Sequence, residues 1–344
     1  MFETDILYPE ILSSLFFEEM YYRHDVIREA HKRTFEWAQD DPRPGFVSWL
    51  RQIHGIFWIQ GKPASGKSIL MKLIHDDLRT RRNLEASHGV ETLSIAGFFF
   101  HDRGSLLQKS LHGVLQAILY LVLKRSRELI PIVFPIATEE QEKTQFETRK
   151  QQRRCTHQEL ERALLDLVGQ SKVVGNVCLF IDALDEYNGG HLEFVELIKA
   201  VAASTNDATL KIKFCISSRL LNVFRDGFED CPGFQIHKWT EGDVSKYATT
   251  RFQEHPRLRF QPCGNEDSSF DTANIGKEVV RRALGVFLWV KLVVDDLLEG
   301  LTDGDTALEL QERLAALPDG LEGLYKQILK RIPPQLPSRC VPFL

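Results

Sequence analysis

The sequence GIFWIQGKPASGKS, residues 55–68, decides the fold class of this chain. Residues 55–59 form a short apolar run of β-branched and aromatic side chains, which is typical of a strand buried on both faces of a sheet. Residues 61–68 satisfy the pattern G-x-x-x-x-G-K-[ST], and a helical pattern begins at Ser68. A strand, a glycine-rich loop and a helix in this order are the setting that a phosphate-binding loop requires. We therefore predict a polyphosphate-binding loop here.

Each part of this loop has an expected role. Gly61 and Gly66 allow the backbone to curl, so that successive amide N–H groups face one anionic group at the positive end of the following helix. We expect Lys67 to bind the β- and γ-phosphate oxygens and the Ser68 hydroxyl to ligate Mg²⁺. The predicted nucleotide contacts are the whole loop and one residue of the helix: Gly61, Lys62, Pro63, Ala64, Ser65, Gly66, Lys67, Ser68 and Leu70.

A second apolar run, residues 177–181, ends in a carboxylate, Asp182, and is followed by Asp185 and Glu186. Ligands of open α/β sheets lie outside the carboxyl ends of the strands. We therefore predict that Asp182 holds Mg²⁺, through a water molecule. Asp185 and Glu186 fall one turn further on, where a carboxylate can orient or deprotonate an attacking water.

A third apolar run, residues 212–216, ends in Ser217, Ser218 and Arg219. A polar triplet at the same sheet edge can detect a γ-phosphate, and Arg219 can neutralise charge that develops in a transition state. The predicted catalytic residues are therefore Asp185, Glu186 and Arg219, and the predicted magnesium ligands are Ser68 and Asp182. Five histidines lie beside charged or turn residues without a plausible nucleophile partner. We interpret them as surface or core residues: His24, His31, His54, His101 and His191.

Composition excludes several classes of function. The chain has 344 residues, of which 43% are hydrophobic and 26% charged, as expected of a globular soluble protein. A net charge of -5 is too balanced for nonspecific binding to a phosphate backbone, so nucleic acid is not an expected partner. The N-terminus is acidic, and no apolar stretch approaches the roughly 20 residues that span a bilayer, so we expect a cytoplasmic protein without a membrane partner. The six cysteines form no CxxC pair and are expected to be free thiols.

The order of the patterns predicts an α/β domain followed by a helical one. Apolar runs alternate with helical patterns, which indicates a mainly parallel sheet in a three-layer α/β/α P-loop NTPase fold. Residues 9–40 have near-helical spacing of apolar side chains and predict a helix. The polar segment 138–158 is interpreted as a solvated helix or loop. Helical patterns then dominate the rest of the chain, over residues 243–254, 276–299, 306–316 and 320–332.

The chain resembles the NACHT NTPases of the STAND class, most closely those of fungal NOD-like receptors. The sharpest mark is the sequence Asp182-Ala183-Leu184-Asp185-Glu186, because the family places a small residue after the magnesium aspartate and an acidic pair three positions later. Other similar stretches are GIFWIQGKPASGKS at 55–68, GFFFHDRG at 97–104, GVFLWVKLVV at 285–294 and LPDGLEGLYKQIL at 317–329.

This resemblance implies a function and a domain plan. It implies ATP/ADP, with GTP as an alternative, bound with Mg²⁺ between the α/β domain and the adjoining helical domain, slow hydrolysis, and a nucleotide-controlled switch. The implied partners are further copies of the chain or other receptor-type proteins, through effector and repeat domains that lie outside this sequence. The expected divisions are a helical lead-in (1–45), a NACHT α/β domain (46–240), a helical domain (241–316) and the truncated start of a winged-helix region (317–344).

Two departures from the family pattern have structural consequences. Ala64 stands where the fungal loops usually carry glycine, and a positive φ at this position would strain the loop. Leu220 follows Arg219 where the family often has proline, which weakens the assignment of a sensor arginine.

Two other classes of function stay open: a nucleotide-binding scaffold or truncated paralogue without hydrolysis, and a metabolic P-loop kinase. Turnover separates the first from an NTPase, and a product other than inorganic phosphate would identify the second.

Overall fold

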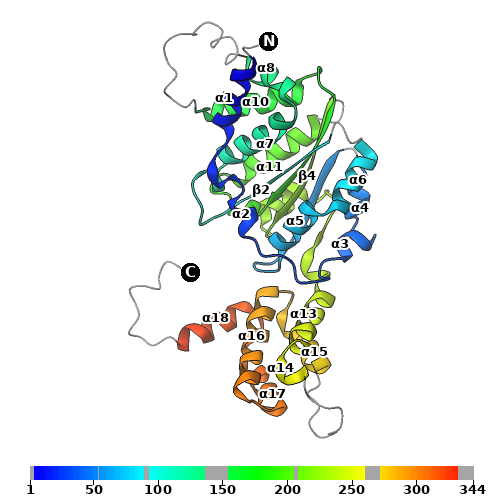
Figure 1. Ribbon diagram of the computed structural model, residues 1–344, viewed down its shortest axis with the longest axis vertical. Coiled ribbons are helices and arrows are strands. Elements are labelled where there is room, and N and C mark those ends of the chain that lie inside the picture. The colour runs from blue at the N-terminus through cyan, green and yellow to red at the C-terminus, as the bar shows by residue number, and fades with distance from the viewer. Residues whose placement is uncertain are drawn as a thin grey trace. The chain divides into compact units, whose positions relative to one another are not determined.

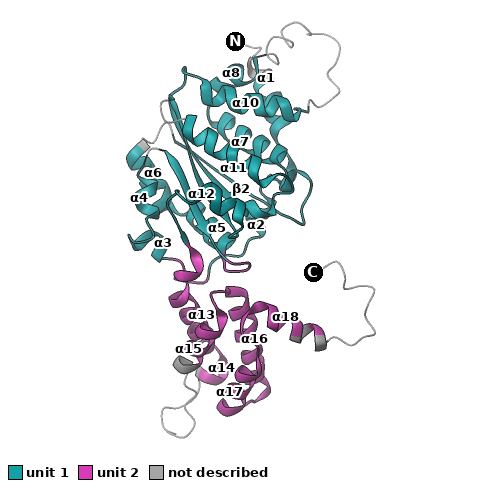
Figure 2. Ribbon diagram, turned by 180° about the vertical axis from the view of Figure 1, so that it is seen from behind, with its two compact units in different colours: residues 1–30, 36–61, 67–234 teal, residues 31–35, 62–66, 235–344 magenta. Residues whose placement is uncertain are grey.

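The computed structural model describes residues 4–52, 54–88, 93–135, 154–204, 208–259 and 272–331 (Figure 1). The chain divides into two compact units, which Figure 2 distinguishes by colour. Unit 1 comprises Met1–Ala30, Glu36–Gly61 and Lys67–Phe234. Unit 2 comprises His31–Phe35, Lys62–Gly66 and Gln235–Leu344. The predicted polar segment 138–158 lies mostly outside the described residues.

A five-stranded sheet in the order β2-β3-β4-β1-β5 forms the centre of unit 1. Its strands are β1 (Gly55–Gln60), β2 (Leu93–Phe99), β3 (Gly175–Asp182), β4 (Leu210–Ser218) and β5 (Gly233–Gln235). The pairs β1–β4, β3–β4 and β2–β3 are parallel, which confirms the predicted sheet. The register pairs Gln60 with Ser218 and Phe99 with Asp182, so these strands finish at one edge.

Helices cover both faces of this sheet, as Figure 1 shows. One face packs against the helices α7 (Leu111–Arg125), α10 (His157–Gly169), α11 (His191–Ser204) and α12 (Asn222–Phe228), and α1 (Thr4–Leu15) packs on α7. The other face packs against α4 (Phe46–Leu50), α5 (Lys67–Asp76) and α6 (Leu78–His88). The fold is therefore the predicted three-layer α/β/α arrangement of a P-loop NTPase. Shorter elements complete the unit: η1 (Glu18–Met20), α2 (Tyr22–Val26), α3 (Trp37–Asp40), η2 (Leu107–Lys109), η3 (Arg127–Leu129), α8 (Ile130–Val133) and η4 (Leu184–Glu186).

The predicted helix across residues 9–40 is wrong as a continuous element, because α1 ends at Leu15 and α2 begins only at Tyr22, and a longer break follows α2. Helix α2 ends at Val26 and α3 begins at Trp37. Between them Arg33 and Phe35 adopt φ values of 60° and 63°, in the left-handed region that a continuous right-handed helix excludes. The turn is fixed within unit 2, where the Phe35 N–H donates to Asp243 Oδ1 over 3.1 Å. Apolar spacing alone did not reveal this break.

Unit 2 is helical after the short turn η5 (Ile236–Lys238). Its helices are α13 (Glu241–Gln253), α14 (Pro256–Arg259), α15 (Thr272–Ala283), α16 (Phe287–Asp303), α17 (Ala307–Ala316) and α18 (Gly320–Arg331). The predicted helix across 276–299 is wrong at one point, because Leu284 and Gly285 have φ values of 51° and 78° and separate α15 from α16. Leu317 and Leu324 lie in the same core as Trp289, so the described part of 317–331 packs with the preceding helices. None of the helices in the described ranges combines the length and apolar character that a bilayer span requires.

Candidate functional site

The end of β1 and the start of α5 form the first part of the site in unit 1. The Gly61 N–H donates to the Ser218 carbonyl over 3.2 Å, which joins the end of β1 to the end of β4. Lys67 Nζ donates to the Gly61 carbonyl over 3.0 Å, so the predicted phosphate-binding lysine folds back over the strand end. Burial lowers the pKa of Lys67, whereas the nearby carboxylates of Asp185 and Asp182 act in the opposite direction. A bound anion would favour the charged form of this lysine in the same way.

Asp182 is the last residue of β3, and its side chain is fully buried. The Ser217 hydroxyl donates to its Oδ1, while its Oδ2 is buried and has no hydrogen-bond partner among the described residues. Burial raises the pKa of Asp182, and the hydroxyls of Ser217 and Ser68 and the Lys67 ammonium oppose that shift. A buried carboxylate oxygen without a partner is costly unless a cation or proton satisfies it. The pair of Asp182 and Ser68 supplies the hard oxygen ligands that Mg²⁺ prefers, so these residues fit that ion.

The polar triplet after β4 divides into two buried serines and one exposed arginine. Ser217 accepts the Ala183 N–H over 3.0 Å and so fixes the turn after β3, in which Ala183 adopts a φ of 60°. Ser218 accepts the indole N–H of Trp58 over 2.8 Å. Both serines are therefore engaged inside the protein, and Arg219 is the member of the triplet that faces solvent.

Arg219 and Asp185 form an ion pair beside this turn. Arg219 Nε lies 2.8 Å from Asp185 Oδ2, and the Arg219 backbone N–H donates to Asp185 Oδ1 over 2.9 Å. The Asp185 side chain is 6% exposed, compared with 49% for Arg219. Both oxygens of Asp185 are thus committed to one neighbour, and this carboxylate is poorly placed to accept a proton from water.

Glu186 has a different environment from its neighbour in the acidic pair. Its Oε2 accepts the backbone N–H of Asp102 over 3.0 Å. Burial raises the pKa of Glu186, and the Asp102 N–H and the charge of Arg23 partly counteract that rise. A carboxyl group with a raised pKa at the edge of a site is a better proton acceptor than one held in an ion pair. The geometry therefore favours Glu186 over Asp185 as a base.

Arg23, on α2, belongs to the same charged cluster and was not predicted from the sequence. Its charge lowers the pKa of both Asp182 and Glu186, which places the guanidinium near the two carboxylates. Its Nε is buried and has no hydrogen-bond partner among the described residues. Buried guanidinium nitrogens are usually paired, so this atom is available to an anionic ligand. A lone arginine in a polar stretch gives no sequence pattern that identifies it.

The tip of the loop, residues 62–66, groups with unit 2. The Ala64 carbonyl accepts the Leu288 N–H over 3.2 Å, and Lys62 Nζ donates to the Leu284 carbonyl over 2.8 Å. Ala64 has a φ of 57°, so the strain expected from an alanine at this position is present. Within the loop the Ser65 N–H donates to the Lys62 carbonyl over 3.3 Å, and Pro63 is exposed.

Gly66 shows why the loop needs a glycine near its end. Its φ is 96°, and a Cβ atom there would lie 3.2 Å from Phe35 Cζ. Leu70, the predicted contact on the helix, is fully buried in unit 1, so its side chain packs in the interior. The roles assigned to the other loop residues stay predictions.

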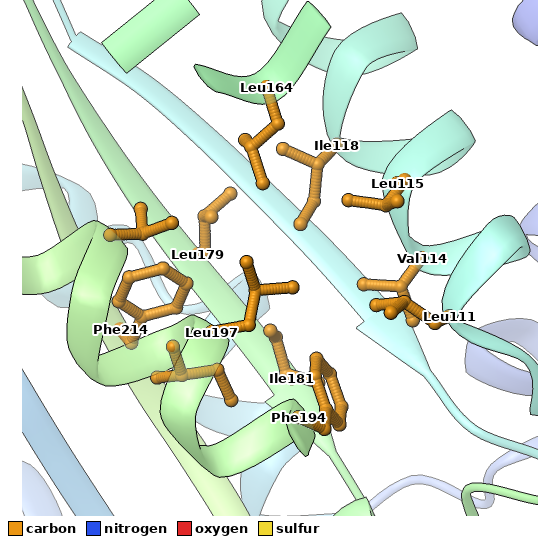
Figure 3. Close-up of a pocket in the computed structure, with 12 residues that line it drawn as sticks. Leu111, Val114, Leu115, Ile118, Leu164, Leu179, Ile181, Phe194, Leu197 and Phe214 are labelled. Atoms are coloured by element: carbon orange, nitrogen blue, oxygen red, sulfur yellow. The ribbon is translucent and has the colours of Figure 1, made fainter. Parts of the chain in front are cut away.

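An apolar cavity elsewhere in unit 1 is not a competing site. It lies among α7, α10, α11 and the strands β3 and β4, and Figure 3 shows that only carbon side chains point into it. Its volume of about 20 Å³ is far below that of a nucleotide, and its lining includes Ile118, Leu179, Phe194 and Phe214.

A parallel sheet with a phosphate loop after β1 and a buried carboxylate at the end of β3 defines a P-loop NTPase. Within this class, the chain belongs to the family described as "Nephrocystin 3, N-terminal", whose model matches residues 33–219, more than half of the chain. A comparison with curated proteins finds no match.

Three solved structures are similar in fold. The Walker-type ATPase PABY2304 of Pyrococcus abyssi is 14% identical, with a TM-score of 0.42 over 88% of this chain and 77% of that one. The origin recognition complex of Drosophila bound to DNA is 14% identical, with a TM-score of 0.48 over 92% of this chain and 70% of that one. PCH-2 of C. elegans is 10% identical, with a TM-score of 0.34 over 94% of this chain and 74% of that one.

Proposed function

We propose that this chain is the switch module of a NOD-like receptor-type signalling protein, and that it binds ATP or GTP with Mg²⁺ and hydrolyses it slowly. The observation that carries the proposal is the buried Asp182, whose Oδ2 has no hydrogen-bond partner among the residues that the structure describes. Lys67 and Ser68 of the loop act on the same carboxylate. A bound magnesium nucleotide would supply the cation and the polyphosphate for which these groups are suited. We expect the protein to act in the cytoplasm and to associate with itself or with related receptor proteins.

Each residue of the site has a separate role in this proposal. Lys67 and the loop amides bind the terminal phosphates, and Ser68 and Asp182 hold the metal ion. Glu186 accepts the proton of the attacking water, because Asp185 is held by Arg219. Arg23 and Arg219 stabilise the negative charge that develops during phosphoryl transfer.

The grouping of the loop tip supports the switch role. Ala64 accepts a hydrogen bond from the first turn of α16, and Lys62 binds the carbonyl of Leu284 between α15 and α16. A nucleotide that changes the loop backbone would therefore act directly on the start of α16. A ligand shifts such an equilibrium only by its different affinity for the two states, so the di- and triphosphate must contact the loop differently.

The test separates binding from hydrolysis. We expect Glu186→Gln to lower the turnover of ATP by about 100-fold or more while the Kd changes by less than about 3-fold, because proton transfer contributes 10²–10⁴ to rates. Phosphate release measures the turnover, and calorimetry with a nonhydrolysable analogue measures the Kd. Asp185→Asn is the matched control, which removes one charge from the same acidic pair and should retain more turnover.

Three outcomes would change the proposal. Loss of turnover in Asp185→Asn but not in Glu186→Gln would reverse the assignment of the base. A wild-type protein that binds nucleotide without releasing phosphate would be a scaffold. Transfer of phosphate to a molecule other than water would make it a kinase.

A further inference from the structure

Helices α2 and α5 lie side by side in unit 1 (Figure 1). A second cluster of charged and imidazole groups joins α2 to the end of α5. His24 comes from α2, and His75 and Asp76 are the last two residues of α5. One ligand atom from each residue lies within 4.8 Å of the others, and within the described residues no other three histidine, cysteine or acidic side chains meet in this way. None of the three belongs to the nucleotide site.

The donor atoms converge on one carboxylate. His24 Nε2 lies 3.0 Å from each oxygen of Asp76, and His75 Nδ1 lies 2.6 Å from Asp76 Oδ1. Donor atoms around a tetrahedral zinc ion at 2.0–2.1 Å lie roughly 3.3 Å apart. The spacing found here therefore needs only small side-chain rotations to match such an ion.

His24 is flanked by carboxylates at both ring nitrogens, because its Nδ1 also lies 3.2 Å from Asp25 Oδ1. A neutral imidazole has one N–H, so it can donate to only one of the two carboxylates and presents a lone pair to the other. If Nδ1–H donates to Asp25, the lone pair of Nε2 faces Asp76. A histidine that ligates a metal usually donates its other N–H to a carboxylate in this way.

Packing fixes the orientation of both rings before any ligand binds. The His75 ring meets Phe180 edge-on at 5.4 Å, and His24 meets Phe99 at 5.1 Å between centroids. A Cβ atom at Gly97 would lie 2.9 Å from His75 Nε2, so this nitrogen faces β2 and Nδ1 faces the cluster. Preoriented donors reduce the ordering cost of binding.

The open side of the cluster can complete a coordination shell. The side chains of His24 and His75 are each 22% exposed, and that of Asp76 is 44% exposed. Two imidazoles and one carboxylate leave one tetrahedral position, which water can occupy. Imidazole ligands favour zinc-like ions over Mg²⁺ or Ca²⁺, which prefer oxygen.

We propose that His24, His75 and Asp76 form a binding site for a divalent transition metal such as Zn²⁺, with Asp25 as the carboxylate that orients His24. The ion fastens α2 to the C-terminal end of α5, the helix that begins with Lys67 and Ser68. Arg23 is the neighbour of His24 on α2, so the same ion restrains the arginine near Asp182 and Glu186. This site stands independently of the proposed nucleotide switch.

The experiment titrates Zn²⁺ alone into the full chain, without a polyhistidine tag and after dialysis against a chelator. We expect saturable binding of one ion by calorimetry, a visible absorption band of tetrahedral type when Co²⁺ replaces Zn²⁺, and a Zn²⁺-dependent rise in Tm. His24→Gln and His75→Gln should each weaken binding by at least about 10-fold, and Asp25→Asn by about 10-fold, as expected for a residue that orients a ligand.

Two control variants separate this site from others. His157→Gln changes a histidine that pairs with one carboxylate, Glu161, and should bind Zn²⁺ as the wild type does. Asp182→Asn removes the predicted magnesium ligand and should also leave Zn²⁺ binding unchanged. Failure of the wild type to bind Zn²⁺, or binding that survives in both His24→Gln and His75→Gln, would overturn the proposal. Circular dichroism of each variant without metal establishes that it is folded.

Discussion

The two ends of the parallel sheet each hold a lysine, fully buried at the amino end and half-buried at the carboxyl end, and the two lysines differ in the groups that surround them. Lys213 lies on β4 opposite Gly55, the first residue of β1, and is 1% exposed. Its Nζ donates to the carbonyls of Trp49, Leu50 and Gln52 over 2.7, 3.2 and 2.6 Å. It also lies 4.1 Å from the centroid of the Trp49 ring. Neutral backbone groups at the end of α4 therefore hold this charge in place.

Lys67, the first residue of α5 beyond the carboxyl end of β1, lies near acidic side chains. It donates to the Gly61 carbonyl, and the carboxylates of Asp185 and Asp182 act on its pKa. Asp182 keeps an oxygen without a hydrogen-bond partner among the described residues. At the amino end of the sheet the buried charge of Lys213 thus stabilises the fold. At the carboxyl end the side chains can still bind further charged groups. Stability and function are separated along the same strands.

The largest effect expected from this contrast is the loss of nucleotide binding in Lys67→Met. Two charge-assisted hydrogen bonds of about 1.5–3 kcal/mol each would be lost, which corresponds to a Kd raised by about 10²–10⁴-fold. The free energy of unfolding without nucleotide should change by less than about 1 kcal/mol, because the substitution also removes a charge that is half-buried. Calorimetry and urea denaturation measure the two quantities. An unchanged Kd would refute the assignment of the site.

The opposite result is expected for Lys213→Met, the next largest effect. Three buried carbonyls would lose their donor, and we expect the free energy of unfolding to fall by about 2–3 kcal/mol. The Kd for nucleotide in the folded protein should stay the same. Lys211→Met, on the same strand but partly exposed, is the control and should cost less than about 1 kcal/mol. Equal losses in the two variants would show that the three carbonyl contacts contribute nothing specific.

The sequence predicted those parts of the molecule whose chemistry lies within one continuous stretch. The phosphate loop occupies adjacent positions, so the roles that we propose for Lys67 and Ser68 follow from spacing alone. The carboxylate Asp182 followed from an apolar strand, because parallel strands bring their carboxyl ends to one edge. The parallel sheet, three of its strands and most helices of unit 2 were predicted for the same reason, since periodicity is a local property.

Features that depend on contacts between distant segments were not predicted. Arg23 joins Asp182 only after α2 has folded against the sheet, and His24 meets His75 for the same reason. The left-handed residues Arg33 and Leu284 interrupt two predicted helices, yet neither is a glycine or proline that would mark a break. The choice between Asp185 and Glu186 needed the ion pair with Arg219, which spacing does not show.

The smallest expected effect concerns pH and tests how tightly the amino end of the sheet holds its charge. Burial lowers the pKa of Lys213 to about 8, compared with about 10.4 in an unfolded chain. Between these values the unfolded chain binds more protons than the folded protein, so the contribution of Lys213 to stability rises with pH. From about pH 8 to pH 9, the free energy of unfolding of the wild type should gain about 1 kcal/mol over that of Lys213→Met. Urea denaturation of both proteins at the two pH values measures this difference, and the comparison cancels groups that titrate in both. If the difference in the free energy of unfolding between the two proteins stays constant, this prediction is wrong. The three carbonyls would then keep Lys213 charged above pH 9.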